Sequence, residues 1–242
     1  MPIVYKRLQP KISLVLWNGK DVLTVTFVIF FFGFIFCFFS IFLLSENRTS
    51  LNLVMLVGSL LGIFIPIIWI KKKYNLSKEA LGLRRGTLNT INSFLIGIGA
   101  ASIYVFLAKL TSLRSGFNTL NFELPFPIIH FIVYPISIDG FIPIILVAVS
   151  EEIIMRGFIY GYFRKKLGVF RGIFAQALFF GLIHYNVFQP YPFLLALDAF
   201  FIGLILGFLY EKTGSLYPSM ICHGTLNYIS TIFDILQYSK LS

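Results

Sequence analysis

The sequence predicts an all-α protein, a polytopic transmembrane helix bundle with seven to eight spans. Two observations lead to this fold class. Hydrophobic residues make up 57% of the 242 residues and charged residues only 12%, which is about half the charged fraction of a soluble domain. The chain also contains long stretches without Asp, Glu, Lys or Arg, and an α-helix needs about 20 mostly apolar residues to cross a bilayer.

The predicted spans follow one another along the chain. The first three contain no charged side chain, and the next four carry the few ionisable groups that fall at membrane depth. The seven predicted spans are residues 22–45, 49–70, 86–108, 141–160, 169–184, 191–210 and 215–236. Residues 124–138 are apolar but contain three prolines, which interrupt helical hydrogen bonding. We therefore expect that segment to be interfacial or re-entrant, or to form an eighth span.

Charge predicts the orientation of the bundle. If the N-terminus is cytoplasmic, 16 of the 20 Lys and Arg residues fall in inner segments and 4 in outer segments. Cytoplasmic loops carry such an excess, so we expect the N-terminus inside and the C-terminus outside a bacterial inner or plasma membrane. The net charge of +10 is thereby explained by orientation in membrane lipid. Because no nucleic-acid-binding spacing accompanies it, nucleic acid is not an expected partner.

Ionisable groups at membrane depth are the candidate functional residues, because each costs at least ~2.5 kcal/mol and usually marks function. Glu152 and Arg156 are four residues apart, so they share a helix face and are expected to form an ion pair. Glu151 lies about 100° around the helix from Glu152 and stays available as a base. A buried structural clasp of all three side chains is the alternative. Asp198, in the sixth predicted span, is expected to find a polar partner.

Two further pairs complete the set. Phe180 and His184 share one helix face, and His223 and Asn227 share another, since each pair is four residues apart. An Asn side chain can orient a carbonyl or an oxyanion. Counted from the basic turn at residues 166–168, Glu151 and His184 lie at nearly the same depth.

A carboxylate and two imidazoles around one cavity suit the hydrolysis of a peptide. Glu151 can take a proton from water, and His184 and His223 can orient that water or stabilise the oxyanion. The same three side chains are also a His₂Glu zinc ligand set. From the residues alone, metal-free and zinc-dependent hydrolysis both stay open.

Three ordered motifs carry a resemblance to a known family. They are EExxxR at residues 151–156, FxxxH at residues 180–184 and HxxxN at residues 223–227. In this order, and across residues 141–230, they resemble the CPBP family of CAAX proteases and bacteriocin-processing (Abi) enzymes, which includes the Ras-converting prenyl-protein endopeptidases. Residues 1–140 then form N-terminal helices with the interfacial segment, and residues 141–236 form a catalytic core within a single membrane domain.

The resemblance implies a role for each residue. Glu151 activates the water, His184 helps to position it, and His223 with Asn227 forms the oxyanion site. Glu152, Arg156 and Phe180 support these groups. The resemblance favours water activated by glutamate without a cofactor, with Zn as the alternative. The implied substrates are membrane-associated peptides or lipidated proteins, either prenylated CaaX proteins or bacteriocin-like peptides.

Two alternatives come from other classes of protein. In a proton- or ion-coupled transporter, buried Glu, His and Asp198 would relay charge. Such transporters usually have broken helices in both halves, whereas the intramembrane charges here all lie in the second half of the chain. A catalytically idle immunity protein that keeps the family fold is the other alternative.

Overall fold

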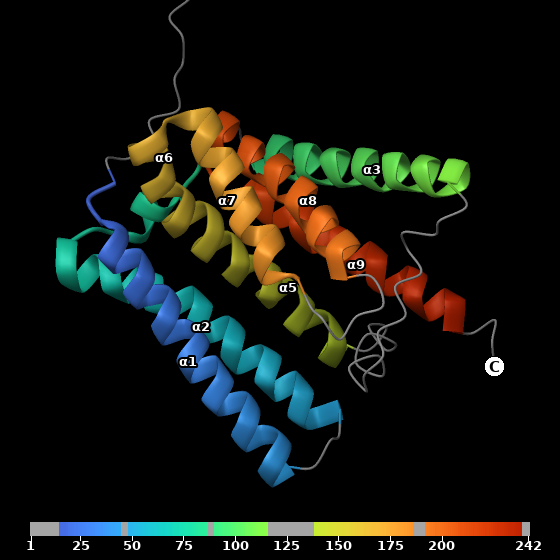
Figure 1. Cartoon of the computed structure of the whole chain (residues 1–242), viewed down its shortest axis with the longest axis horizontal. Helices are drawn as coiled ribbons and strands as arrows, with labels where there is room; N and C mark the ends of the chain where they lie inside the picture. The colour runs from blue at the N-terminus through green and yellow to red at the C-terminus, as the bar shows by residue number, and fades with distance from the viewer. Residues whose placement is uncertain (1–14, 45–47, 87–89, 116–137, 186–191, 239–242) are drawn as a thin grey trace, which may run out of the picture.

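A computed structural model of the chain describes residues 15–44, 48–86, 90–115, 138–185 and 192–238. All regular structure in these residues is helical (Figure 1), which confirms the predicted all-α class. The segment predicted as interfacial or as an eighth span, residues 124–138, lies outside the described residues except at its last position.

The observed helices agree closely with the predicted spans. The N-terminal helices are α1 (Gly19–Leu44), α2 (Arg48–Tyr74), the short 3₁₀ helix η1 (Lys78–Leu81) and α3 (Thr90–Ser115). The remaining helices are α5 (Ile138–Glu152), the π-helix η2 (Ile153–Tyr160), α6 (Gly161–Leu167), α7 (Val169–Ile183), α8 (Pro192–Thr213) and α9 (Tyr217–Tyr238).

Three described helices are long and apolar enough to cross a membrane, at Gly19–Phe36, Leu53–Tyr74 and Pro192–Thr213. Two shorter apolar helices lie at Ile91–Phe106 and Val169–Ile183. Large side chains such as Phe34 and Phe170 are 72% and 83% exposed, and apolar side chains on the outside of a bundle are suited to lipid. The protein is therefore a membrane protein, and the number of crossings stays a prediction.

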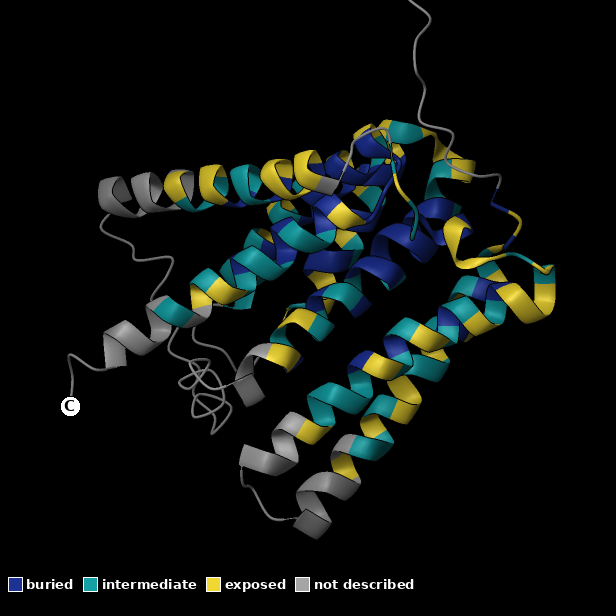
Figure 2. Ribbon diagram, turned by 180° about the vertical axis from the view of Figure 1, so that it is seen from behind, coloured by how far each residue is buried: buried dark blue, intermediate teal, exposed yellow. Residues whose placement is uncertain are grey.

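The segment formed by α5 and η2 lies in the middle of the bundle (Figure 1). Helix α2 packs on α5 on one side and pairs with α1, while α9 packs on α5 from the other side. Helix α7 runs along α8, and α3 lies against α9. Buried residues are concentrated around η2, and exposed residues cover the outer faces of the helices (Figure 2). The helices on both sides of residue 140 thus surround the two adjacent glutamates.

Several basic loops meet at one end of the bundle. The amide of Leu216 donates to the carbonyl of Gly82 over 3.0 Å, and Arg84 donates to the carbonyl of Gly214 over 3.1 Å. Arg164 donates to both carboxylate oxygens of Glu211, at 2.8 and 2.9 Å. The turns after α2, α6 and α8 therefore lie on the same side, as the charge distribution predicts.

The π-helix η2 was not predicted, because its residues read as the end of an ordinary apolar span. A π-helix inserts extra backbone into a helical turn and is often found at functional sites. Gly157 allows the close packing here, because a Cβ at this position would lie 2.7 Å from the carbonyl oxygen of Leu81 in η1. Trp17 stacks on Phe158 and donates to its carbonyl over 2.8 Å. These contacts fix the position of η2, which directly follows Glu151 and Glu152 in the chain.

Candidate active site

The first motif forms a fully buried ion pair. Arg156 Nη1 lies 2.8 Å from Glu152 Oε1, and neither side chain has any exposed surface. The guanidinium also lies 4.6 Å above the ring of Phe180 and donates to the carbonyl of Gly203 over 3.4 Å. The predicted Glu152–Arg156 pair is confirmed, and the pair ties η2 to α7 and α8.

The imidazole of His223 lies between the two glutamates. Its Nδ1 is 2.9 Å from Glu152 Oε1, and its Nε2 is 3.5 Å from Glu151 Oε2. A carboxylate paired with Arg156 can only accept, so Nδ1 carries the proton and donates it to Glu152. Nε2 is thereby directed at Glu151, whose side chain is 27% exposed.

The role of Glu152 toward His223 was missed by sequence reasoning, which paired this glutamate with Arg156 alone. Spacing along one helix identifies partners on that helix, but not a partner on α9, 71 residues further along the chain. A hydrogen bond from an imidazole to a carboxylate fixes both the orientation of the ring and its tautomer.

His184 follows the last residue of α7 and is held by the same helix. Its Nδ1 donates to the carbonyl of Phe180 over 2.7 Å, which leaves Nε2 for other groups. The ring centroids of Phe180 and His184 are 4.3 Å apart, so the predicted shared face is confirmed. Phe180 also meets His223 edge to face at 5.9 Å. One aromatic ring therefore lies against both imidazoles.

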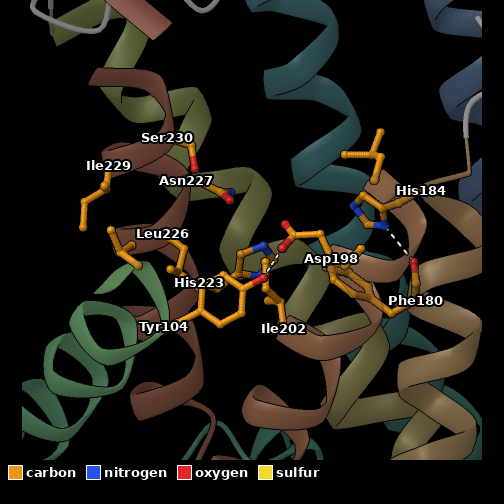
Figure 3. A pocket seen from close by; sticks show the side chains of 13 residues that line it. Tyr104, Phe180, His184, Asp198, Ile202, His223, Leu226, Asn227, Ile229 and Ser230 are labelled. Carbon is orange, nitrogen blue, oxygen red and sulfur yellow. Dashed lines mark hydrogen bonds between the residues drawn. The ribbon is translucent and has the colours of Figure 1, made fainter. Parts of the chain in front are cut away.

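Two cavities adjoin these groups. The His223 cavity, of about 180 Å³, is lined by His184, Asp198, His223 and Asn227 among others (Figure 3). The Glu151 cavity, of about 330 Å³, is lined by Glu151 and His184 together with residues of α1 and α2. His184 lines both cavities, and Glu151 Oε2 lies 3.5 Å from His223 Nε2. The structure thus brings the three candidate catalytic side chains to one junction, with Asn227 in the His223 cavity.

Asp198 has a partner that the sequence did not indicate. The hydroxyl of Tyr104 in α3 donates to its carboxylate, and both side chains line the His223 cavity (Figure 3). Tyr104 was missed because a tyrosine in an apolar helix is common. The pairing brings a helix from outside the three motifs into contact with the site.

No zinc ligand set is present in the described part of the chain. No three His, Cys, Asp or Glu side chains there are arranged to hold a metal ion. Nδ1 of each imidazole is engaged, so Nε2 is the ring nitrogen of His184 and of His223 that is left for a metal ion. Zinc-dependent hydrolysis stays a prediction, and the chemistry below is derived from the side chains alone.

A helical membrane bundle with a glutamate and two imidazoles at one junction contains the groups that hydrolysis within a membrane needs. Residues 134–229 match a family model described as type II CAAX prenyl endopeptidase Rce1-like. This segment contains all three motifs, and the match supports an assignment to the CAAX proteases, which are peptide hydrolases. Comparisons with curated proteins and with solved structures gave no match.

Proposed function

We propose that the protein is an intramembrane endopeptidase in which Glu151 activates the hydrolytic water. The observation that carries this proposal is the position of His223, with Nδ1 2.9 Å from Glu152 and Nε2 3.5 Å from Glu151. One glutamate is neutralised and orients the imidazole, while the other stays accessible from a cavity. An accessible carboxylate beside an oriented imidazole is suited to general base catalysis.

The proposed reaction starts with a water between Glu151 and the substrate carbonyl. Glu151 accepts a proton from this water, and the resulting hydroxide attacks the carbonyl carbon. The tetrahedral oxyanion accepts hydrogen bonds from the amide of Asn227 and from Nε2–H of the doubly protonated His223, whose Nδ1–H is bonded to Glu152, while His184 orients the water. The C–N bond then breaks, and the leaving amine takes the proton from Glu151, so that the carboxylate is regenerated.

The substrate we propose is a prenylated protein or peptide that ends in a CaaX sequence. The description of the matched family supports this choice, and the lipid-facing surfaces of the bundle suit a substrate that carries an apolar chain. A bacteriocin-like membrane peptide is the second candidate. Cleavage of a farnesylated CaaX peptide, compared with the same peptide without the prenyl group, separates the two.

The test of the function is cleavage of that farnesylated peptide by the purified protein in lipid nanodiscs. Loss of one member of such a catalytic constellation lowers kcat by about 10²–10⁴-fold, so Glu151→Gln and His184→Ala should be nearly inactive. Glu79→Gln is the matched control, because Glu79 is exposed on η1. Wild-type rates in Glu151→Gln and His184→Ala would remove the protease assignment.

Treatment with a metal chelator distinguishes metal-free hydrolysis from zinc-dependent hydrolysis. Water activated by glutamate predicts full activity after treatment with a strong chelator. Activity that disappears and returns on addition of Zn²⁺ would instead support the zinc-dependent form. A pure, folded wild-type protein that cleaves neither peptide would favour the idle immunity protein or the transporter.

A further inference from the structure

The Glu151 cavity contains more polar groups than the three motifs supply. It lies where the α1–α2 pair meets α5 and α7. Besides Glu151 and His184, it is lined by Thr26 of α1, Ser59 of α2 and Ser150 of α5. None of these three hydroxyl-bearing residues belongs to a motif, and Thr26 and Ser59 lie outside the segment that matches the family.

Two of these hydroxyls have no protein partner among the described residues. Buried serine and threonine hydroxyls in membrane helices usually bond back to their own helix. Thr213 does so with the carbonyl of Leu209, and Ser150 with that of Val147. The buried hydroxyl oxygens of Thr26 and Ser59 make no such bond within the described chain, and both residues line the Glu151 cavity.

Buried polar groups without protein partners are typically satisfied by ordered water. A cavity of about 330 Å³ has room for several waters, since each occupies about 30 Å³. Glu151 and His184 offer polar atoms to this cavity, while the hydroxyl oxygens of Thr26 and Ser59 are enclosed side-chain atoms of residues in its wall. A stable buried water needs two to four polar partners. The cavity is therefore suited to a chain of waters.

Glycines on α2 keep the space open. A Cβ on Gly62 would lie 3.0 Å from Ser150 and from Ile154, so this glycine packs α2 tightly on the central helix. A Cβ on Gly58, one turn earlier, would meet nothing within 4 Å, and Gly58 lines the cavity. Gly58 and Gly62, which are four residues apart on α2, thus combine one open position with one close helix contact.

We propose that the Glu151 cavity is the water compartment of this enzyme, and that Thr26 and Ser59 position the waters that reach Glu151. The scissile carbonyl then lies in the His223 cavity, because His223 and Asn227 line that cavity and would stabilise the oxyanion. His184 lines both and contacts both reactants. This assignment rests on the proposed function, and it gives the α1–α2 pair a direct part in hydrolysis within a lipid environment.

Thiol labelling tests the water compartment without any need for cleavage. In the full chain with Cys37→Ala and Cys222→Ala, single cysteines are placed by Ser59→Cys or Leu60→Cys, and the protein is reconstituted in nanodiscs. The probe is a charged methanethiosulfonate reagent. Since only a water-accessible thiol ionises and reacts, Ser59→Cys should label at least about tenfold faster than its lipid-facing neighbour Leu60→Cys. Equal or negligible labelling of both would overturn the proposal.

Removal of the hydroxyls tests their effect on catalysis. Misplacement of a reactant costs up to about 10²-fold, so Thr26→Val with Ser59→Ala should lower kcat by about 10–100-fold with little change in KM. Thr24→Val is the control, because Thr24 is exposed on the same helix. If the hydroxyls instead face a dry void, the double variant should be more thermostable and fully active, and the proposal fails.

A substitution that fills the Glu151 cavity provides a third test. Gly58→Leu should lower both the labelling of Ser59→Cys and the rate of cleavage. Gly99→Leu, at a position on α3 where a Cβ also meets nothing within 4 Å, should lower neither. Rapid labelling of Ser59→Cys, together with a wild-type protein that cleaves no peptide, would contradict the protease function while leaving the water-filled cavity in place.

Discussion

Two adjacent glutamates have different environments, and this difference is the central feature at the scale of single residues. The side chain of Glu152 is fully buried and that of Glu151 is 27% exposed. A buried carboxylate without a partner costs several kcal/mol, and Arg156 and His223 supply the partners. Glu152 is therefore fixed in place, and Glu151 alone has access to a cavity.

Loss of Arg156 should destabilise the whole bundle. Arg156→Met leaves the carboxylate of Glu152 buried without its counter-charge, so we expect the free energy of unfolding to fall by about 3–5 kcal/mol. Thermal unfolding in detergent measures this. Arg164→Met, at the partly exposed pair with Glu211, should cost less.

The double variant Arg156→Met with Glu152→Leu distinguishes this explanation from simple loss of packing. Removal of both charges should restore part of the lost stability, since no ion is then left unpaired. A double variant that is less stable than Arg156→Met alone would contradict the role assigned to the ion pair.

Tyr104 and Asp198 should be energetically coupled. Their hydrogen bond joins α3 to α8 at the His223 cavity. Tyr104→Phe removes the donor and Asp198→Leu removes the acceptor, so each variant leaves one partner unsatisfied. We expect an interaction energy of about 0.5–3 kcal/mol in a double-mutant cycle of unfolding. Strictly additive effects would show that the contact contributes nothing to stability.

At the scale of single elements, η2 has a strict packing requirement at Gly157. Gly157→Ala would bring a methyl group to 2.7 Å from the carbonyl of Leu81, and overpacking of this kind costs about 1–3 kcal/mol. The expected result is a lower unfolding temperature. Gly33→Ala is the control, because a Cβ there meets nothing within 4 Å. If Gly157→Ala and Gly33→Ala are equally stable, then η1 moves away from the added methyl group without a cost in stability.

At the scale of the whole molecule, the clustered basic loops predict the orientation in the membrane. Single cysteines introduced by Lys78→Cys and Lys165→Cys should react with an impermeant thiol reagent only after cells are opened. Arg48→Cys, at the start of α2, should react on intact cells, because 16 of the 20 basic residues are expected inside. The reverse pattern would invert the topology.

Sequence patterns along one helix were sufficient for several features of the site. The pairing of Glu152 with Arg156, and of Phe180 with His184, depends on a spacing of four residues, which helix geometry converts directly into a shared face. The boundaries of the long apolar helices followed from the length that a bilayer demands. Such local rules predicted the long described helices, whereas the 3₁₀ helix η1, the π-helix η2 and the short helix α6 were not predicted.

The sequence by itself determined the membrane class, the helices and the residues with hydrolytic potential, because apolar length and buried charge are properties of single segments. Only the tertiary structure decided which residues meet: His223 with Glu152, Tyr104 with Asp198, and Thr26 and Ser59 in the wall of the Glu151 cavity. These contacts join helices far apart in the chain. They depend on how each helix is rotated and tilted against its neighbours, and packing sets those angles.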